Sequence, residues 1–341
     1  MPLTINPPLL NSANPWATDL ADLRALYASP YTGAITTRTS LLAGFPHTPA
    51  HNQYTFFSPS TQQPVSGGPD PSPASTPPTH SASLNTLGYS PHPLSTYLSH
   101  VSALSREACA PASRLRRDKP IILSVTGTPS EVATCYTAIA AHARSVAMPL
   151  ALELNLSCPN IPGKPPPAYS RATLVEYLRA LARVYKDGAG VAVGVKVPPY
   201  THAGMFEDFA RALGEVLPSP VAFVTAVNTL APALVLAGEG GEGEALRPAL
   251  ASASGLGVGG MAGAPLHALA LGNVLGLREA LARVPELRGV MLIGIGGVED
   301  AEGYRRMRSV GAGAVGVGTA LGRFGVDVFE RIWKGLERPK L

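Results

Sequence analysis

Residues 150–160 read LALELNLSCPN and run from an apolar stretch directly into a polar turn. Leucine recurs at every second position of 150–156, which is the side-chain period of a β-strand. Ser157, Cys158, Pro159 and Asn160 follow at the carboxyl end of this strand. The stretch therefore predicts a buried strand that delivers a thiol and amides to one edge of a sheet.

The same pattern recurs along the chain, where short apolar segments alternate with longer amphipathic ones, as βαβ crossovers require. Seven segments are predicted as strands: 34–39, 121–126, 150–156, 191–197, 222–228, 290–295 and 314–317. An eighth is expected within 3–11 or near residues 58–83. Segments with a helical pattern include 129–145, 170–185, 203–216, 265–283, 300–309 and 326–336.

Polar or glycine-rich motifs follow nearly every predicted strand. A closed (β/α)₈ barrel collects its active site from all the carboxyl ends of its strands, whereas an open doubly wound sheet concentrates it at one switch point. We therefore predict an α/β fold of the TIM-barrel type, with residues 1–341 forming a single domain.

The composition agrees with such a core. Hydrophobic residues make up 45% of the 341 residues and charged residues only 15%, as expected when strands are buried on both faces. The net charge of +4 comes without a basic run, so the sequence offers no nucleic-acid footprint. No apolar stretch is long enough for a membrane span, and three cysteines without a CxxC pair favour a reducing compartment, so a cytoplasmic location is expected.

Residues 58–83 are rich in Pro and Ser and nearly lack large apolar side chains. Such a segment cannot offset the entropy of ordering by burial, so we predict a disordered surface insertion within the domain.

Two glycine motifs follow the last two predicted strands, which take the seventh and eighth positions of the barrel. They are Gly294-Ile-Gly-Gly297 and Gly316-Val-Gly-Thr319. In barrels, loops at these positions bind phosphate through backbone N–H groups, and glycine permits the close approach. A third stretch, 255–260, is a candidate to complete the phosphate site. Neither a nicotinamide fingerprint nor a P-loop is present, and no histidine spacing suggests a metal site, so none is predicted.

Cys158 lies where a strand end faces a barrel mouth, between Asn155 and Asn160. Amides both donate and accept, which suits a flat heterocycle with carbonyl and N–H groups. Lys196 ends the next strand and could neutralise the negative charge of a bound ligand. The alternative is that these residues are a buried thiol, turn-forming asparagines and a solvated lysine.

With these motifs, the sequence resembles the dihydroorotate dehydrogenase family and, within it, the soluble class 1A enzymes, which contain FMN, form homodimers and reduce fumarate. The resemblance rests on ELNLSCPNIPGKP at 153–165, VKVPPY at 195–200, VNT at 227–229, GVGG at 257–260, GIGG at 294–297 and VGTAL at 317–321.

The resemblance implies oxidation of dihydroorotate to orotate in pyrimidine biosynthesis, with Cys158 taking the C5 proton while hydride passes to FMN. It implies these substrate-binding residues: Asn85, Leu87, Gly88, Tyr89, Asn155, Asn160, Asn228 and Thr229. It implies these FMN-binding residues: Ala13, Thr37, Asn155, Lys196, Gly260, Gly296, Gly297, Gly318 and Thr319. A thiol base needs a nearby donor or cation, and Ser157 and Lys164 are close in sequence.

The sequence departs from the family at 35–39, ITTRT, where Thr37 occupies the position of a lysine that contacts flavin and substrate. Arg38 could supply the cation only through a bulge or a register change, because adjacent strand residues face opposite sides. Near the N-terminus, Asn11-Ser-Ala-Asn14 stands where the family has NASG, so a permissive glycine close to the flavin is replaced.

Two alternatives therefore stay open beside dihydroorotate oxidation with fumarate as acceptor. The first is an FMN oxidoreductase acting on another dihydropyrimidine or an α,β-unsaturated compound. The second is a catalytically silent flavin-binding protein. In each case the expected partners are small molecules and a second copy of the chain, with no nucleic acid or membrane.

Overall fold

The computed structural model describes residues 3–161, 163, 165–186, 188, 190–238 and 245–337. Eight parallel strands form one sheet in the order β1-β14-β13-β8-β7-β6-β5-β2. In chain order these are β1 (Leu9–Asn11), β2 (Ile35–Thr36), β5 (Ile121–Val125), β6 (Leu150–Asn155), β7 (Val191–Val197), β8 (Val221–Ala226), β13 (Met291–Ile295) and β14 (Ala314–Val317).

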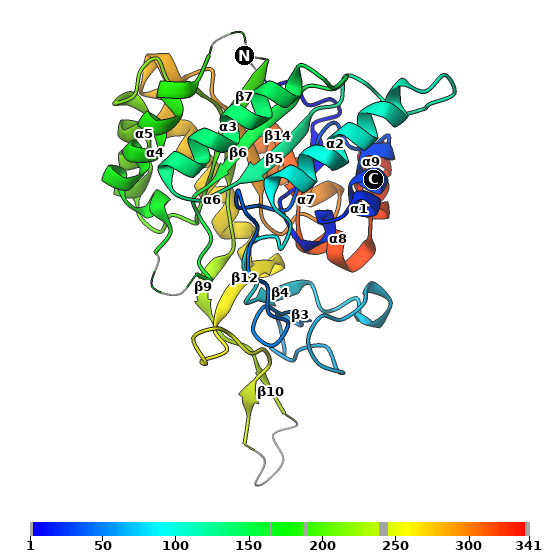
Figure 1. The fold of residues 1–341 in the computed structure, drawn as a ribbon. Coiled ribbons are helices and arrows are strands. Elements are labelled where there is room, and N and C mark those ends of the chain that lie inside the picture. Colours follow the sequence, from blue (N-terminus) through cyan, green and yellow to red (C-terminus); the bar gives the residue numbers. More distant parts are fainter. Residues whose placement is uncertain are drawn as a thin grey trace.

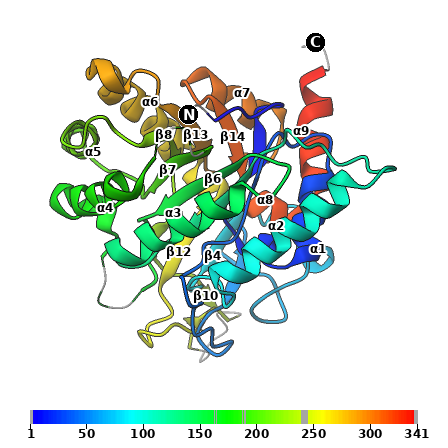
Figure 2. The ribbon, with the colours of Figure 1, turned by 45° about the horizontal axis from the view of Figure 1, so that its top comes forward.

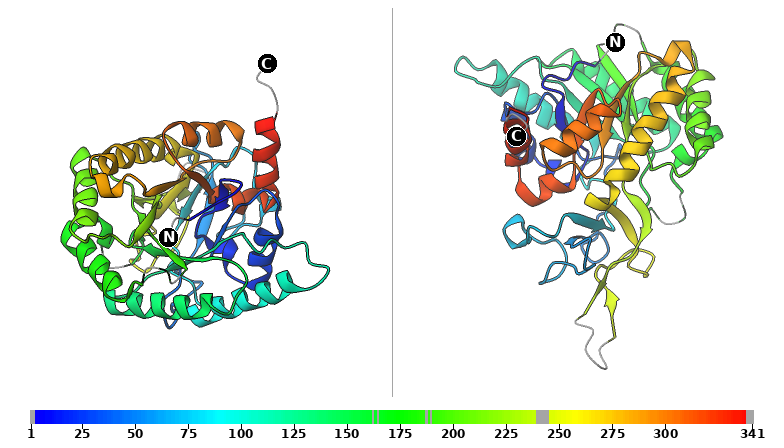
Figure 3. Two further views of the ribbon diagram at one scale, coloured as in Figure 1. Left: turned by 90° about the horizontal axis from the view of Figure 1, so that it is seen from above. Right: turned by 180° about the vertical axis from the view of Figure 1, so that it is seen from behind.

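Helices surround this sheet as an outer ring, which is seen end-on in Figure 3 and tilted in Figure 2. They are α1 (Leu20–Ala28), α2 (Leu94–Cys109), α3 (Pro129–Ala143), α4 (Arg171–Val184), α5 (Ala203–Gly214), α6 (His267–Ala282), α7 (Ala301–Ser309), α8 (Thr319–Phe324) and α9 (Asp327–Glu337). The predicted (β/α)₈ barrel is confirmed: all seven predicted strands are present, and the eighth is β1, within 3–11. Among the described helices, none is long and apolar enough to cross a membrane.

Local sequence explains where the helices begin. Thr128 precedes α3, its hydroxyl accepts from the Glu131 backbone N–H at 3.3 Å, and the Glu131 carboxylate accepts from the Thr128 N–H at 2.7 Å. This capping box, with Pro129 in the first turn, satisfies donors that the helix itself leaves unpaired. Asp19 and Asp22 build the same arrangement at α1.

The core of the barrel has two layers. A large cluster fills the space between strands and helices, and a smaller one fills the barrel interior, including Leu10, Ile122, Phe223 and Ile293. Phe223 needs a glycine opposite it, because a Cβ at Gly194 would lie 2.2 Å from its ring. All seven residues of β7 are buried, as the composition indicated.

The barrel closes between β1 and β2 without a regular ladder. The Gly33 N–H donates to the Leu9 carbonyl at 2.8 Å, and the Asn11 side chain makes the remaining bonds. Asn11 Nδ2 donates to the Thr36 carbonyl at 2.6 Å, and Asn11 Oδ1 accepts from the Thr36 N–H at 2.9 Å. Thus one buried amide replaces a strand-to-strand peptide contact.

A second sheet covers the carboxyl ends of the barrel strands (Figure 1). Its strands are antiparallel, in the order β3 (Tyr54–Phe57), β4 (Ala82–Asn85), β12 (Gly259–Gly263) and β9 (Leu230–Ala233). A small hairpin, β10 (Leu236–Ala237) and β11 (Arg247–Pro248), extends beyond it. The repeated βα pattern gave no signal for this sheet, because the paired strands β4 and β12 lie far apart in the sequence.

The Pro/Ser-rich segment connects β3 to β4. It contains the short 3₁₀ helix η2 (Pro73–Ser75), a bridge between Phe57 and Pro64, and a bond from Arg323 Nη2 to the Pro78 carbonyl of 2.7 Å. Because it connects β3 to β4 of the second sheet, it lies near the barrel mouth. Its disorder stays a prediction.

We predict that Asn11→Ala destabilises the protein by roughly 2–4 kcal/mol, because both backbone groups of Thr36 lose their partner in a buried seam. Chemical denaturation with a spectroscopic probe measures this loss. The control is Ser99→Ala on α2, an exposed hydroxyl bonded only to the Ser95 carbonyl, which we expect to stay within about 0.5 kcal/mol of the parent. Equal stabilities of the Asn11 and Ser99 variants would contradict the role given to Asn11.

Candidate active site

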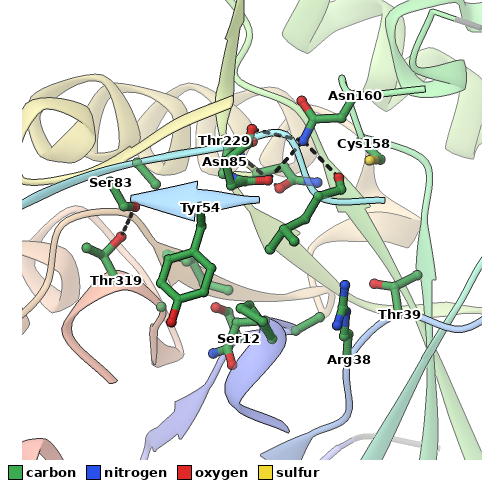
Figure 4. A pocket seen from close by; sticks show the side chains of 18 of the residues that line it. Ser12, Arg38, Thr39, Tyr54, Ser83, Asn85, Cys158, Asn160, Thr229 and Thr319 are labelled. Atoms are coloured by element: carbon green, nitrogen blue, oxygen red, sulfur yellow. Dashed lines mark hydrogen bonds between the residues drawn. The ribbon is translucent and has the colours of Figure 1, made fainter. Parts of the chain in front are cut away.

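An open cavity lies between the barrel mouth and the second sheet. Figure 4 shows side chains from both parts pointing into it. All predicted site residues line it except Thr37 and Gly260. They are Cys158, Asn85, Leu87, Gly88, Tyr89, Asn155, Asn160, Asn228, Thr229, Ala13, Lys196, Gly296, Gly297, Gly318 and Thr319.

Thr37 was predicted at the cavity but lies behind its wall. Its side chain is 1% exposed, and its hydroxyl accepts from the Ser124 N–H at 3.2 Å. Gly260 lies in β12, where a Cβ would come within 2.1 Å of the Thr229 hydroxyl. Gly260 therefore gives Thr229 room at the cavity wall, and the third glycine stretch contributes to the second sheet rather than to a phosphate loop.

Arg38 lines the cavity in place of Thr37 because the segment that follows β2 has one residue more than the part of β5 that it faces. Thr36 pairs with Ile122 and Ser40 with Val125, so four steps on one strand match three on the other. The Arg38 N–H leaves the ladder and donates to the Ala17 carbonyl at 2.9 Å. Such a bulge reorients side chains, and both Arg38 and Thr39 face the cavity (Figure 4).

Two cations thus reach the cavity, Arg38 and Lys196. Arg38 is 9% exposed and makes one long bond, from Nη2 to the Gly88 carbonyl at 3.4 Å. Lys196 is 3% exposed, and its Nζ donates no hydrogen bond within the described part of the chain. Burial lowers the pKa of both groups, opposed for Lys196 by Glu153. No acidic residue is among those that line the cavity, so an anionic ligand is favoured there.

Asn85 and Asn160 are hydrogen-bonded to each other, and Asn160 is also hydrogen-bonded to the loop after β4. Asn160 Nδ2 lies 2.9 Å from Asn85 Oδ1, 2.9 Å from the Leu87 carbonyl and 3.1 Å from the Asn85 carbonyl (Figure 4). Asn85 Nδ2 donates to the Gly260 carbonyl at 3.2 Å. These amides hold the loop 87–89 against Cys158, and a ligand that binds them must exchange some of these bonds.

A second buried chain of hydrogen bonds runs from Asn228 toward Glu153. Asn228 Nδ2 donates to Ser157 Oγ at 2.8 Å, and Ser157 Oγ donates to Asn155 Oδ1 at 2.8 Å. Asn155 Nδ2 then donates to Thr39 Oγ1 at 2.8 Å. Thr39 continues through Ser124 to the Glu153 carboxylate, with contacts of 2.9 Å. Ser157 therefore orients amides rather than Cys158, while Lys164 lies outside the described residues.

Cys158 borders the cavity. It directly follows Ser157, which belongs to the hydrogen-bond chain from Asn228 to Glu153. Burial raises the pKa of its thiol, while the Asn160 backbone N–H, Lys196, the Tyr89 hydroxyl and Arg38 oppose the shift. A thiol with several stabilising partners, beside a cavity, is suited to take a proton. Of the other cysteines, Cys135 is buried and Cys109 exposed, so only Cys135 fills the core.

The two glycine loops lie side by side, because β13 and β14 are neighbours. Within the described residues, the N–H groups of Gly297 and Gly318 donate to no protein acceptor, whereas Gly296 directly follows Ile295 of the ladder that pairs β13 with β14. Gly297 has φ +66°, and a Cβ there would lie 2.7 Å from the Gly263 carbonyl oxygen. Free backbone donors at a cavity are suited to a phosphate. With the unpaired Lys196 ammonium, these loops fit a phosphorylated, anionic cofactor such as FMN.

Several cavity residues could not be found from the sequence. Trp16 and Tyr54 pack edge to face, with ring centroids 5.3 Å apart, and Ser83 joins Thr319 at 2.8 Å. Tyr54 and Ser83 lie on the second sheet, and Arg38 depends on the bulge. In the described residues, no group of three or more His, Cys, Asp or Glu side chains could hold a metal ion.

Comparison with known proteins gives one consistent family. Residues 50–339 match the family model described as dihydroorotate dehydrogenase. The chain is 30% identical over 327 residues to the dihydroorotate dehydrogenase (fumarate) of Trypanosoma cruzi, covering 95% of this chain and 87% of that protein. It is 34% identical over 185 residues to the Saccharomyces cerevisiae protein of the same name, covering 54% and 53%.

The fold is also shared with solved structures. A crystal structure of DHODH from Eimeria tenella in complex with ferulenol superimposes with a TM-score of 0.68 at 18% identity. The match covers 98% of this chain and 81% of that one. At this identity the likeness concerns the barrel and its covering elements alone.

We predict that Gly297→Ala lowers flavin content sharply, because the new Cβ would displace the loop from the Gly263 carbonyl. The measurement is flavin absorbance per chain after purification. Gly325→Ala is a matched control, since Gly325 has φ +63° and a Cβ added there would meet no atom within 4 Å. In both variants an alanine at positive φ strains the backbone by about 1 kcal/mol. Equal flavin loss in the two would therefore contradict a specific role for Gly297.

Proposed function

We propose that this chain, which belongs to the dihydroorotate dehydrogenase family, oxidises dihydroorotate to orotate with FMN as cofactor. The observation that carries the proposal is the meeting of Cys158, Arg38 and Lys196 in one cavity whose lining has no acidic residue. A thiol base beside two buried cations matches a substrate that loses a carbon-bound proton and carries a carboxylate.

The cofactor end of the cavity is assigned to the glycine loops and Lys196. The loops that carry Gly296, Gly297 and Gly318 would hold the phosphate through backbone N–H groups, and Lys196 would contact the isoalloxazine ring. When bound, FMN supplies the acceptor for the hydride from C6 of the substrate. Ala13 and Thr319 complete the lining at this end.

The chain's own residues handle the proton and the orientation. Cys158 as thiolate accepts the C5 proton, so that the C5–H bond breaks as an S–H bond forms. Asn85, Asn155, Asn160 and Asn228 surround the ring with donors and acceptors, which suits the pyrimidine carbonyl and N–H groups. Backbone N–H groups of 87–89 and the Arg38 guanidinium receive the carboxylate.

Arg38 bears on the choice between substrates. The alternative of a substrate without a carboxylate was motivated by Thr37 in place of a lysine. Because the bulge brings the Arg38 guanidinium into the cavity, a cation is available after all. This supports dihydroorotate over an uncharged dihydropyrimidine.

The wider setting follows from the family and from relatives' names. We propose fumarate as the electron acceptor, since the T. cruzi and S. cerevisiae relatives carry it in their names. We further propose a role in pyrimidine biosynthesis, a cytoplasmic location, a homodimer and one FMN-binding domain spanning 1–341. Anaerobic reduction of the protein by dihydroorotate, followed by reoxidation with fumarate, tests this function. Flavin that dihydroorotate does not bleach would refute it.

We predict that Arg38→Gln lowers kcat/KM for dihydroorotate about 10- to 100-fold, because a charge-assisted bond to the carboxylate contributes roughly 1.5–3 kcal/mol. Turnover of dihydrouracil, which lacks that carboxylate, should change little. The control is Arg24→Gln, an exposed arginine paired with Glu107 on the barrel exterior. A wild-type protein that prefers dihydrouracil would favour the alternative substrate class.

We predict that the rate of flavin reduction by dihydroorotate rises with pH, since burial raises the pKa of Cys158 and the thiolate forms only as pH approaches that value. Cys158→Ala should lower this rate about 10²- to 10⁴-fold and remove the rise. Stopped-flow absorbance measures both effects. Cys109→Ser, an exposed thiol outside the cavity, should match the wild type, and a pH-dependent rate in Cys158→Ala would assign the proton to another group.

A further inference from the structure

His267 connects the glycine loop after β13 to helix α7 from a place behind the cavity wall. It is the first residue of α6, and its Nδ1 lies 2.7 Å from the Gly296 carbonyl oxygen. On the other side of the imidazole, Arg306 of α7 donates from Nε to His267 Nε2 at 3.0 Å. Neither side chain is among the described residues that line the cavity, and the proposed function gives neither of them a role.

The contact with Arg306 decides which nitrogen of the imidazole carries the hydrogen. An arginine Nε–H can only donate, so His267 Nε2 is the acceptor. A neutral imidazole has one donor and one acceptor nitrogen, and its hydrogen therefore lies on Nδ1. His267 thus donates to the Gly296 carbonyl, and Arg306 keeps the imidazole in the tautomer that can do so.

The peptide between Gly296 and Gly297 relates this outer contact to the cavity. The peptide is trans and planar, so its C=O and its N–H point in opposite directions. The carbonyl faces His267, and the N–H therefore faces the other side of the loop. Gly297 lines the cavity, and its N–H has no protein acceptor among the described residues. The bond to His267 thereby directs a free donor toward the cavity.

Close packing fixes the position of the loop but leaves the orientation of this peptide open. A Cβ at Gly296 would lie 2.5 Å from Ala270 Cβ, and a Cβ at Gly297 would lie 2.8 Å from His267 Cβ and 2.7 Å from the Gly263 carbonyl oxygen. Between two glycines a peptide can turn over at little steric cost, because glycine tolerates both signs of φ. The hydrogen bond from His267 therefore selects one of two orientations.

We propose that His267, held by Arg306, is a positioning residue that keeps the N–H of the Gly296–Gly297 peptide directed at the phosphate of the bound flavin. This inference rests on the proposed function, which assigns the phosphate to the glycine loops, and it names the residue that prepares one of them. The turned-over peptide would present its carbonyl oxygen to the anion, which is repulsive. The bond to His267 therefore matters more for a phosphate than for an uncharged ligand.

The test compares FMN with riboflavin, which has the same ring and ribityl chain without the phosphate. Full-length protein freed of bound flavin is titrated with each, and the quenching of flavin fluorescence gives the Kd. His267→Leu removes the donor, so we expect the Kd of FMN to rise about tenfold and that of riboflavin to stay within about twofold. An unchanged Kd of FMN overturns the proposal, and so does an equal rise for both flavins.

His267→Asn is the conservative variant. Asparagine has nearly the shape of leucine, but its Nδ2 can donate in the place of the imidazole Nδ1, so the Kd of FMN should return to within about threefold of the wild-type value. Equally weak FMN binding by the two variants would assign His267 a packing role and overturn the proposal.

His142→Leu is the matched control. His142 is also a partly buried histidine on a barrel helix, and its Nε2 lies 3.1 Å from Ser102 Oγ, where α3 meets α2. Both dissociation constants should equal those of the wild type. A rise in the Kd of FMN as large as that in His267→Leu would overturn a specific role for His267.

A second readout needs neither flavin nor a variant that folds poorly. Nitrogen NMR of wild-type protein labelled with ¹⁵N-histidine distinguishes the two neutral tautomers, and we expect the hydrogen of His267 on Nδ1. A hydrogen on Nε2 overturns the role of His267 and leaves the proposed function untouched. Wild-type protein that binds FMN no more tightly than riboflavin refutes the phosphate site of the proposed function, and with it this inference.

Discussion

The shape of the cavity depends on the two hydrogen bonds that the Asn11 side chain makes to the backbone of Thr36. Seven of the eight strand boundaries in the barrel are parallel ladders, but β1 and β2 meet through the Gly33 N–H and the Asn11 amide. The residues immediately beyond this seam face the cavity, Ser12 and Ala13 on one side and Arg38 on the other. A single buried amide therefore holds Ser12 and Ala13 in place relative to Arg38 at the cavity wall.

The bulge beyond β2 is the second consequence of that seam. The Arg38 N–H bonds the Ala17 carbonyl from the segment that follows β1, while Thr37 and Ser40 keep their bonds to β5. The extra residue is thus stabilised by the chain that Asn11 positions. The cation that the family resemblance leads one to expect at position 37 is supplied by Arg38, one residue later, with Thr37 facing the wall.

The sequence predicted those parts of the fold that depend on local pattern. Strand periodicity placed seven of the eight barrel strands and gave two possible places for the eighth, and motifs at strand ends placed Cys158, Lys196 and both glycine loops at one mouth. It could not place Arg38, because a bulge depends on hydrogen bonds to distant chain segments. The second sheet was not predicted for a similar reason. The strand β4 has only four residues, and long segments of the sequence separate it from its partners β3 and β12. Thr37 and Gly260 were assigned by motif position, which does not determine which way a residue faces.

The two ends of the cavity differ in how much they must change on binding. At the glycine loops, the N–H groups of Gly297 and Gly318 have no protein partner among the described residues, so an anion gains bonds there without breaking any. At the other end, Asn160 Nδ2 already contacts three acceptors with two hydrogens. A ring that binds this amide takes bonds from Asn85 or Leu87, and the same bonds hold the loop carrying Tyr89. Contact of a ligand with Asn160 is therefore coupled to the position of the loop 87–89 at the cavity wall.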